Sequence, residues 1–146
     1  SLPERPSVPG RPRRDGGAWL TAAISDRGSG AVTVKALDSA ARTLWEVRLE
    51  LGAPLLRIVL LDSDAAGNTY LAGETGRESA TPPYRIVDLQ LAIVGLDGNG
   101  AERGRLNLPS VASAEESFRT LTVGDDGTLY RMRSEPEGIV IESFRL

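Results

Sequence analysis

The chain contains neither cysteine nor histidine among its 146 residues. It therefore has no disulfide framework, no thiolate nucleophile, no imidazole base and no zinc site built from cysteine and histidine. These absences exclude most of the common enzyme constellations. We accordingly expect a protein that is not an enzyme, with no catalytic residue, no metal and no cofactor.

Long hydrophobic runs are absent as well. No apolar stretch reaches the roughly 20 residues that a membrane-spanning helix needs, and the N-terminus lacks the apolar core of a signal peptide, so no transmembrane segment is expected. The net charge is −3, and the seven aromatic residues are not interleaved with basic ones. A mildly acidic chain of this kind offers no surface that follows phosphates, which disfavours nucleic-acid binding.

Turn-forming residues are abundant, with 16 glycines and 9 prolines. Residues 1–17 read SLPERPSVPGRPRRDGG, and this composition is typical of a linker or tail. From residue 18 onward, short apolar runs alternate with turn residues. The sequence thus predicts one folded domain over residues 18–146 that is all-β and antiparallel.

Alternation of apolar and polar residues identifies the strands. In Thr43–Leu51 the residues Trp45, Val47, Leu49 and Leu51 fall on one face, as in a strand. Weaker patterns of the same kind bring the number of expected strands to ten: 18–25, 31–37, 43–51, 55–61, 69–73, 85–96, 101–108, 118–123, 128–133 and 139–145. The segment Ser110–Ser117 is the one place where a single helical turn competes with a loop.

Asp/Gly turns separate most of these strands, which favours hairpins between sequence neighbours. The longest interruption is Glu74–Tyr84, where Pro82 and Pro83 cannot donate ladder hydrogen bonds. We expect an exposed excursion there, and interpret it as a neutral insertion in preference to a binding loop.

The chain also carries an internal repeat. Residues 57–73 and 118–133 share one pattern, which makes Tyr70 and Tyr130 equivalent at a spacing of 60 residues, while Leu37 and Leu96 are 59 residues apart. Trp19 aligns with Tyr70 in this scheme. The repeat is a meander of four strands, of which the first copy supplies three, the second four and the third three. A period of this length predicts the blades of a β-propeller.

Two motifs carry a resemblance to known proteins. The element D-x-D-x-x-G-N-x-Y-x-A-G, from Asp62 to Gly73, resembles the repeats of bacterial β-propeller proteins, both quinoprotein-like and NHL-like. Ala36-Leu37-Asp38 followed by Trp45 is similar to a quinoprotein-like blade signature, although Ala41-Arg42 stands where Thr-Gly is expected and no tryptophan lies near position 104. The resemblance implies a partial propeller of about two and a half blades and a location in the bacterial periplasm, at the cell surface or outside the cell. A quinone cofactor is not implied. A β-sandwich remains the alternative fold.

Three functions are compatible with a partial propeller, the third being an enzyme whose catalytic residues lie on a stretch outside the given sequence. The first is a non-enzymatic interaction or structural module that is completed by a protein partner, by a second copy or by missing sequence, since closed propellers need 4–8 blades. The alternative is a carbohydrate-binding, lectin-like assembly in which aromatic side chains stack on sugars, the candidates being Trp19, Trp45, Tyr70 and Tyr130. Their equivalent repeat positions favour a packing role instead.

The remaining polar candidates have structural interpretations. Asp62 and Asp64 precede a glycine as in a calcium loop, but Ala66 occupies a ligand position, which favours a plain hairpin turn. The pair Asp125-Asp126 is interpreted in the same way. Glu115 and Glu116 would point to opposite faces of a strand, and Lys35 lies opposite the valines of its strand, so each is expected to be a solvated charge.

Overall fold

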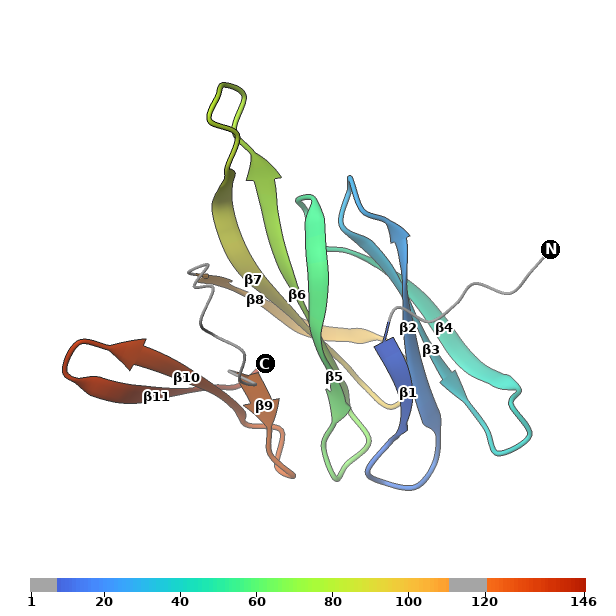
Figure 1. Ribbon diagram of the computed structural model, residues 1–146. Coiled ribbons are helices and arrows are strands. Elements are labelled where there is room, and N and C mark those ends of the chain that lie inside the picture. Colours follow the sequence, from blue (N-terminus) through green and yellow to red (C-terminus); the bar gives the residue numbers. More distant parts are fainter. Residues whose placement is uncertain (1–7, 111–120) are drawn as a thin grey trace.

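The computed structural model describes residues 8–110 and 121–146, which form eleven strands and, within those ranges, no helix (Figure 1). The predicted all-β, antiparallel character is therefore confirmed. Ten of the eleven strands lie where the alternating pattern placed them, with shifts of a few residues at their ends. Of the segment Ser110–Ser117, residues 111–117 lie outside the described part of the chain.

The strands form three separate sheets, and each sheet is a meander of consecutive strands. Sheet A consists of β1 (Val8–Pro12), β2 (Trp19–Asp26), β3 (Ala31–Leu37) and β4 (Thr43–Glu50). Sheet B consists of β5 (Leu55–Ser63), β6 (Thr69–Glu78), β7 (Ile86–Leu96) and β8 (Glu102–Pro109). Sheet C consists of β9 (Leu121–Val123), β10 (Leu129–Glu135) and β11 (Gly138–Phe144), with β10 in the middle. Within the described residues no sheet closes on itself, and three sheets do not correspond to the two of a β-sandwich.

Strand β1 lies in the segment that the composition assigned to a linker or tail. Among the described strands it is the edge strand of sheet A, and it pairs with β2, with an interruption of the register between Val8 and Arg11. An edge strand tolerates proline because one side of its backbone has no partner to receive an N–H group. Sheet A consequently has four strands instead of the expected three.

The interruption predicted at Glu74–Tyr84 is shorter than expected. Its first residues continue β6 as far as Glu78, and Thr75 is buried, so the exposed connection begins at Ser79. Pro82 and Pro83 lie in this connection, outside the ladder.

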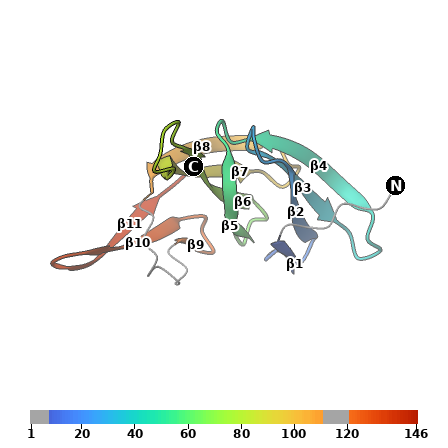
Figure 2. The ribbon, with the colours of Figure 1, turned by 45° about the horizontal axis from the view of Figure 1, so that its top comes forward.

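Sheet B lies between the other two sheets and packs on both of them. Seen in Figure 2, the three sheets follow one another along an arc, with β1, β5 and β9 on its inner side. Because side chains alternate along a strand, Leu71 of β6 belongs to the core shared with sheet A, while its neighbour Tyr70 belongs to the core shared with sheet C. Each fully buried leucine stabilises such a core by about 1.5–3 kcal/mol, so the two cores hold the three sheets together.

Three of the hairpin turns begin with an aspartate that organises the loop. The Oδ1 atoms of Asp38, Asp64 and Asp97 each accept hydrogen bonds from the backbone N–H groups two and four residues later, at 2.8–3.0 Å. The residue three positions after the aspartate has a positive φ in every case. Glycine occupies this position in two turns, at Gly67 and Gly100, but Ala41 occupies it in the first, with φ of 62°.

Replacement of Ala41 by glycine is therefore expected to stabilise the protein by about 1 kcal/mol. An alanine in the left-handed region carries a steric penalty between Cβ and the backbone that glycine does not have. Thermal or urea unfolding measures the difference. Ala40→Gly in the same exposed loop is the matched control, and it should leave stability unchanged or lower it slightly, because Ala40 is not among the residues with positive φ. Equal effects of the two changes would contradict the prediction.

Candidate interaction surface

Each sheet has two faces, which we name by the order of the sheets along the chain. The following face of a sheet points toward the next sheet in the sequence, and the preceding face points toward the previous one. The following faces of sheets A and B are covered by sheets B and C. In the described part of the chain nothing covers the following face of sheet C.

The hydrogen bonds that close the hairpin turns define which positions of the three sheets are equivalent. The turn before each of β2, β6 and β10 is closed by a hydrogen bond to a backbone carbonyl group. The accepting carbonyls are those of Ala18, Asn68 and Thr128. Counting from these residues makes Leu20, Tyr70 and Tyr130 equivalent, and strand pairing then aligns the facing positions of β3, β7 and β11. The equivalence of Tyr70 and Tyr130 agrees with the sequence repeat. Trp19 is equivalent to Thr69 instead of Tyr70, because the turn before β2 is one residue longer.

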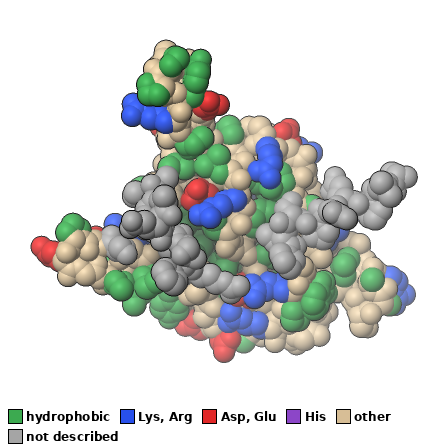
Figure 3. All heavy atoms as spheres, viewed as in Figure 1, with side chains coloured by type: hydrophobic (Ala, Val, Ile, Leu, Met, Phe, Trp, Pro, Cys, Tyr) green, Lys and Arg blue, Asp and Glu red, His purple; other side chains and the backbone are tan. Residues whose placement is uncertain are grey.

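Equivalent positions on the following faces differ sharply in exposure. Four positions in each of sheets A and B are at most 5% exposed: Leu20, Ala22, Val32 and Val34 on sheet A, and Tyr70, Ala72, Leu91 and Ile93 on sheet B. On sheet C the same positions hold Tyr130, Met132, Ile139 and Ile141, which are 41%, 39%, 67% and 68% exposed. Hydrophobic side chains along the β10–β11 hairpin are visible in Figure 3. Sheet C thus presents to solvent the kind of surface that its neighbours bury.

Sheet C also has an open strand edge. In sheets A and B the third strand pairs with a fourth, β4 or β8, whereas β11 has no described partner strand besides β10. The outer edge of β11 therefore leaves backbone N–H and C=O groups available for another strand.

A cavity of about 500 Å³ lies where the first strands of the three sheets meet. Its wall combines apolar side chains of β5 and β9, such as Leu60 and Leu121, with the polar groups of Arg11, Arg14 and Asp62. Its lining residues come from β1, β5 and β9, the strands on the inner side of the arc in Figure 2, and from the turn after β1. The guanidinium groups of Arg11 and Arg14 are bound to Asp62 and to backbone carbonyls, so the described lining provides no free cation for a ligand.

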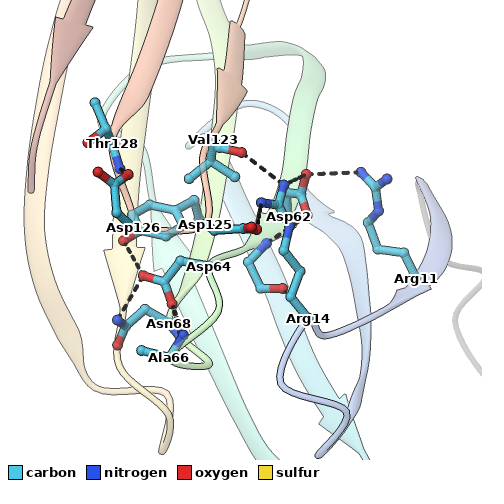
Figure 4. A network of polar contacts seen from close by, with 12 residues as sticks. Arg11, Arg14, Asp62, Asp64, Ala66, Asn68, Val123, Asp125, Asp126 and Thr128 are labelled. Atoms are coloured by element: carbon cyan, nitrogen blue, oxygen red, sulfur yellow. Dashed lines mark hydrogen bonds and ion pairs between the residues drawn. The ribbon is translucent and has the colours of Figure 1, made fainter.

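Arg14 connects all three sheets at the rim of this cavity (Figure 4). It lies in the turn between β1 and β2, and its guanidinium group donates hydrogen bonds to Asp62 of β5 at 3.1 Å, to the carbonyl of Val123 of β9 at 2.8 Å and to Asp125 at 2.9 Å. Its backbone N–H donates to the Oγ of Ser63 at 2.8 Å. The planar, multidentate guanidinium suits this bridging role.

Neighbouring contacts reinforce this junction, by which we mean the meeting point of the three sheets around Arg14. Arg11 donates to the carbonyl of Leu61 at 3.0 Å and lies 3.8 Å from Asp62. The backbone N–H of Ala65 donates to the carbonyl of Asp125 at 2.9 Å. The polar residues of the cavity therefore join the sheets to one another.

Asp64 and Tyr70 form a buried polar pair behind the junction. The Oδ2 atom of Asp64 accepts hydrogen bonds from the hydroxyl of Tyr70 and from the Asn68 side chain, both at 2.9 Å. Burial alone would raise the pKa of Asp64, but the hydrogen bonds from Asn68, Tyr70 and Ala66 together hold this pKa below its usual value. Burial and the bond to Asp64 raise the pKa of Tyr70 to about 12. The pair is thus a fixed structural contact of a carboxylate with a neutral phenol.

The carboxylates considered for calcium have separate partners. Asp62 faces Arg14, whereas Asp64 closes its own turn, and the two side chains do not converge (Figure 4). Asp125 binds Arg14, and Asp126 binds Thr128 and Arg145. In residues 8–110 and 121–146, no group of three or more acidic side chains is placed to hold a metal ion.

The remaining charged candidates have different outcomes. Lys35 lies on the face of β3 opposite the buried valines, as predicted, and forms an ion pair with Glu46 at 3.5 Å. Glu115 and Glu116 fall outside the described residues.

The four aromatic residues considered for sugar binding do not form one groove. Tyr70 is buried between sheets B and C, and Trp45 packs in the core between sheets A and B while its Nε1 donates to the carbonyl of Gly98. Trp19 and Tyr130 are exposed, but Trp19 lies on the preceding face of sheet A and Tyr130 on the following face of sheet C. Tyr70 and Trp45 are therefore packing residues. Trp19 and Tyr130 are exposed because each lies on a face that no other described sheet covers.

The role of Arg14 was not predicted from the sequence. A signal was present, because Arg13-Arg14-Asp15-Gly16 has the same arrangement of two polar residues before a glycine as Gly124-Asp125-Asp126-Gly127. The last glycine of each segment has a positive φ, 78° for Gly16 and 84° for Gly127. The turn was hidden by the proline-rich composition around it.

In the ranges that the structure describes, no helix is long and apolar enough to cross a membrane. Comparison of the chain with protein-family models, with curated proteins and with solved structures found no match.

Proposed function

We propose that the chain is a non-enzymatic interaction and structural module of the β-propeller type, acting in the envelope of a bacterial cell or outside it. In this proposal sheets A, B and C are consecutive blades. The meander within each sheet, the stacking of faces and the position of β1, β5 and β9 around one cavity support a blade arrangement. The cellular location rests on the sequence resemblance.

The observation that carries the proposal is the uncovered following face of sheet C. Contiguous exposed apolar residues on a soluble protein mark sites of protein interaction. Here the equivalent residues of sheets A and B are buried against another sheet, which indicates that a further sheet is the natural cover of Ile139, Ile141 and their neighbours. The module therefore acts by docking another protein surface.

The polar groups of the cavity support a structural role over catalysis. Arg14 and Arg11 are bound to Asp62 and to backbone carbonyls, and Asp64, which lies outside the cavity lining, is bound to Tyr70. A general acid, a base or a nucleophile needs an atom within reach of a substrate. These groups are instead occupied in joining sheet to sheet.

Site-specific photo-cross-linking in the producing cells tests the proposal. A photoreactive phenylalanine derivative at position 141 or 139 should form a cross-link to a protein, because both side chains are two-thirds exposed on the docking face. The same group at position 84 is the matched control, since Tyr84 is 63% exposed but lies in the connection between β6 and β7. Absence of a cross-link at 139 and 141, or equal labelling at 84, would refute the proposed docking face.

A further inference from the structure

The two ends of the sheet stack carry different surfaces. Among residues 8–110 and 121–146, nothing covers the following face of sheet C at one end or the preceding face of sheet A at the other. The described residues of the sheet C face include no charged side chain, since they are Thr122, Tyr130, Met132, Ile139, Ile141 and Ser143. A surface that covers this uncharged face must bring no unpaired charge, because burying an unpaired charge is costly.

The preceding face of sheet A carries large apolar residues at the positions with which sheet C covers sheet B. Its Trp19 and Leu37 are directly paired across β2 and β3, and they occupy the positions of Leu129 and Phe144 on sheet C. Leu129 and Phe144 belong to the core with which sheet C covers sheet B. Trp19, by contrast, is 45% exposed, although it is one of the largest apolar side chains in the protein.

Charged residues on this face do not prevent stacking, because sheet C shows how they are accommodated. The position of Lys35 in sheet A is that of Glu142 in sheet C. Glu142 is paired with Arg133, and Arg131 donates to the carbonyl of Pro109 in sheet B. Lys35 is likewise already paired, with Glu46 of its own sheet. An ion pair made within one sheet adds no uncompensated charge to the contact.

We propose that a second copy of this chain covers the following face of sheet C with the preceding face of its own sheet A. This inference rests on the proposed function, and it names the partner. Both sheet contacts within the chain join a following face to a preceding face, so the contact between copies repeats the internal one. Two copies joined in this way at both ends place six sheets in one ring, within the usual range of 4–8 blades. A contact that joins unlike faces closes into such a ring when the rotation between sheets allows it, and otherwise extends into filaments.

The mass of the purified chain in solution is the first test. Light scattering during size exclusion should give twice the 15.6 kDa of one chain. Ile141→Arg should weaken the association at least tenfold, because an exposed isoleucine on the sheet C face becomes a charge inside the contact. Tyr84→Arg is the matched control and should leave the mass unchanged.

A mixing experiment identifies which faces meet. Trp19→Arg changes the sheet A face and should weaken association as Ile141→Arg does. A mixture of the two variants should recover dimers, because each mixed pair retains one contact between two unaltered faces. Circular dichroism checks that each variant folds, and Thr21→Arg on the same face of β2 replaces Trp19→Arg if that variant does not fold.

Three results would overturn the inference. A wild-type chain that stays monomeric excludes the second copy, and cross-linking to a different protein would then leave the proposed function intact. A normal dimer of Trp19→Arg beside a monomeric Ile141→Arg would show that two sheet C faces meet. Species that grow with concentration beyond two chains would exclude the closed pair.

Discussion

Replacement of Gly30 by alanine is expected to lower the free energy of unfolding by about 3 kcal/mol or more. Gly30 has a φ of 70°, and a Cβ atom there would lie 2.3 Å from the carbonyl oxygen of Ala53. The positive φ costs about 1–2 kcal/mol for alanine, and overpacking against a backbone atom adds about 1–3 kcal/mol. Denaturant unfolding measures the sum.

The position of Gly30 explains why the backbone cannot simply move aside. It is the last residue of the turn between β2 and β3, its carbonyl accepts the N–H of Leu51 at 3.0 Å, and Ala53 lies in the connection from sheet A to sheet B. A shift of that connection would disturb Leu51 and Leu55, which belong to the core between the two sheets. The added methyl group would thus weaken the contact between the sheets.

Two other glycines separate the causes of this loss. Gly52 has a φ of 83° and open space around it, so Gly52→Ala should cost only the conformational part, about 1 kcal/mol. Gly28 lies in the same turn as Gly30 without a positive φ, and Gly28→Ala should change stability by less than about 0.5 kcal/mol. If Gly30→Ala costs no more than Gly52→Ala, the close approach to Ala53 does not matter and the account is wrong.

Replacement of Asp64 by alanine is the second change with a large expected effect, a loss of about 3 kcal/mol. Asp64 is 2% exposed and accepts hydrogen bonds from two backbone N–H groups, from Asn68 and from Tyr70. A hydrogen bond to a charged group contributes about 1.5–3 kcal/mol. The substitution also leaves the buried hydroxyl of Tyr70 without its acceptor. Urea unfolding monitors the loss.

Asp97→Ala is the matched control because Asp97 begins an equivalent turn. Its Oδ1 accepts the same two backbone hydrogen bonds, but its carboxylate lacks the contacts that Oδ2 of Asp64 makes with a tyrosine and an asparagine. The expected cost is about 1 kcal/mol, similar to the loss of a capping side chain. Equal costs for the two substitutions would mean that the Asp64–Tyr70 contact adds no stability.

The same carboxylate predicts a dependence of stability on pH. The pKa of Asp64 in the folded protein lies below the ordinary value of 3.8, so its ionised form stabilises the fold. This contribution is complete above the unfolded pKa, near pH 4, and is lost as the pH falls through the folded pKa. Acid unfolding of Asp64→Ala should therefore show a smaller loss of stability below pH 4 than the wild type. Parallel curves would contradict the assignment.

The strands could be predicted from the sequence because their information is local. Alternation in Thr43–Leu51 placed Trp45, Val47 and Leu49 toward the core, and the structure confirms it. Turn chemistry worked for the same reason, since Asp64 and Asp97 act on backbone groups only two and four residues away. Local patterns reported the elements and most of their faces.

The junction of the sheets could not be predicted, because its contacts join residues far apart in sequence. Arg14 lies 48 residues from Asp62 and 111 residues from Asp125, and nothing in the proline-rich segment around it indicates either partner. Strand β1 was missed because an edge strand needs only one hydrogen-bonded neighbour and so accepts Pro12. The misplacement of Trp19 came from one additional residue in the preceding turn, which shifts every later side chain to the other face.

The meander within each sheet bears on how the polypeptide acquires its structure. Every ladder joins neighbours in sequence, so a hairpin needs to close only a short loop before its hydrogen bonds form. Such local topology favours rapid folding for a β protein, whose usual delay comes from pairing distant segments. During synthesis from the N-terminus, sheet A can assemble first and offer a template on which sheet B condenses. Each newly formed layer then shields the one made before it.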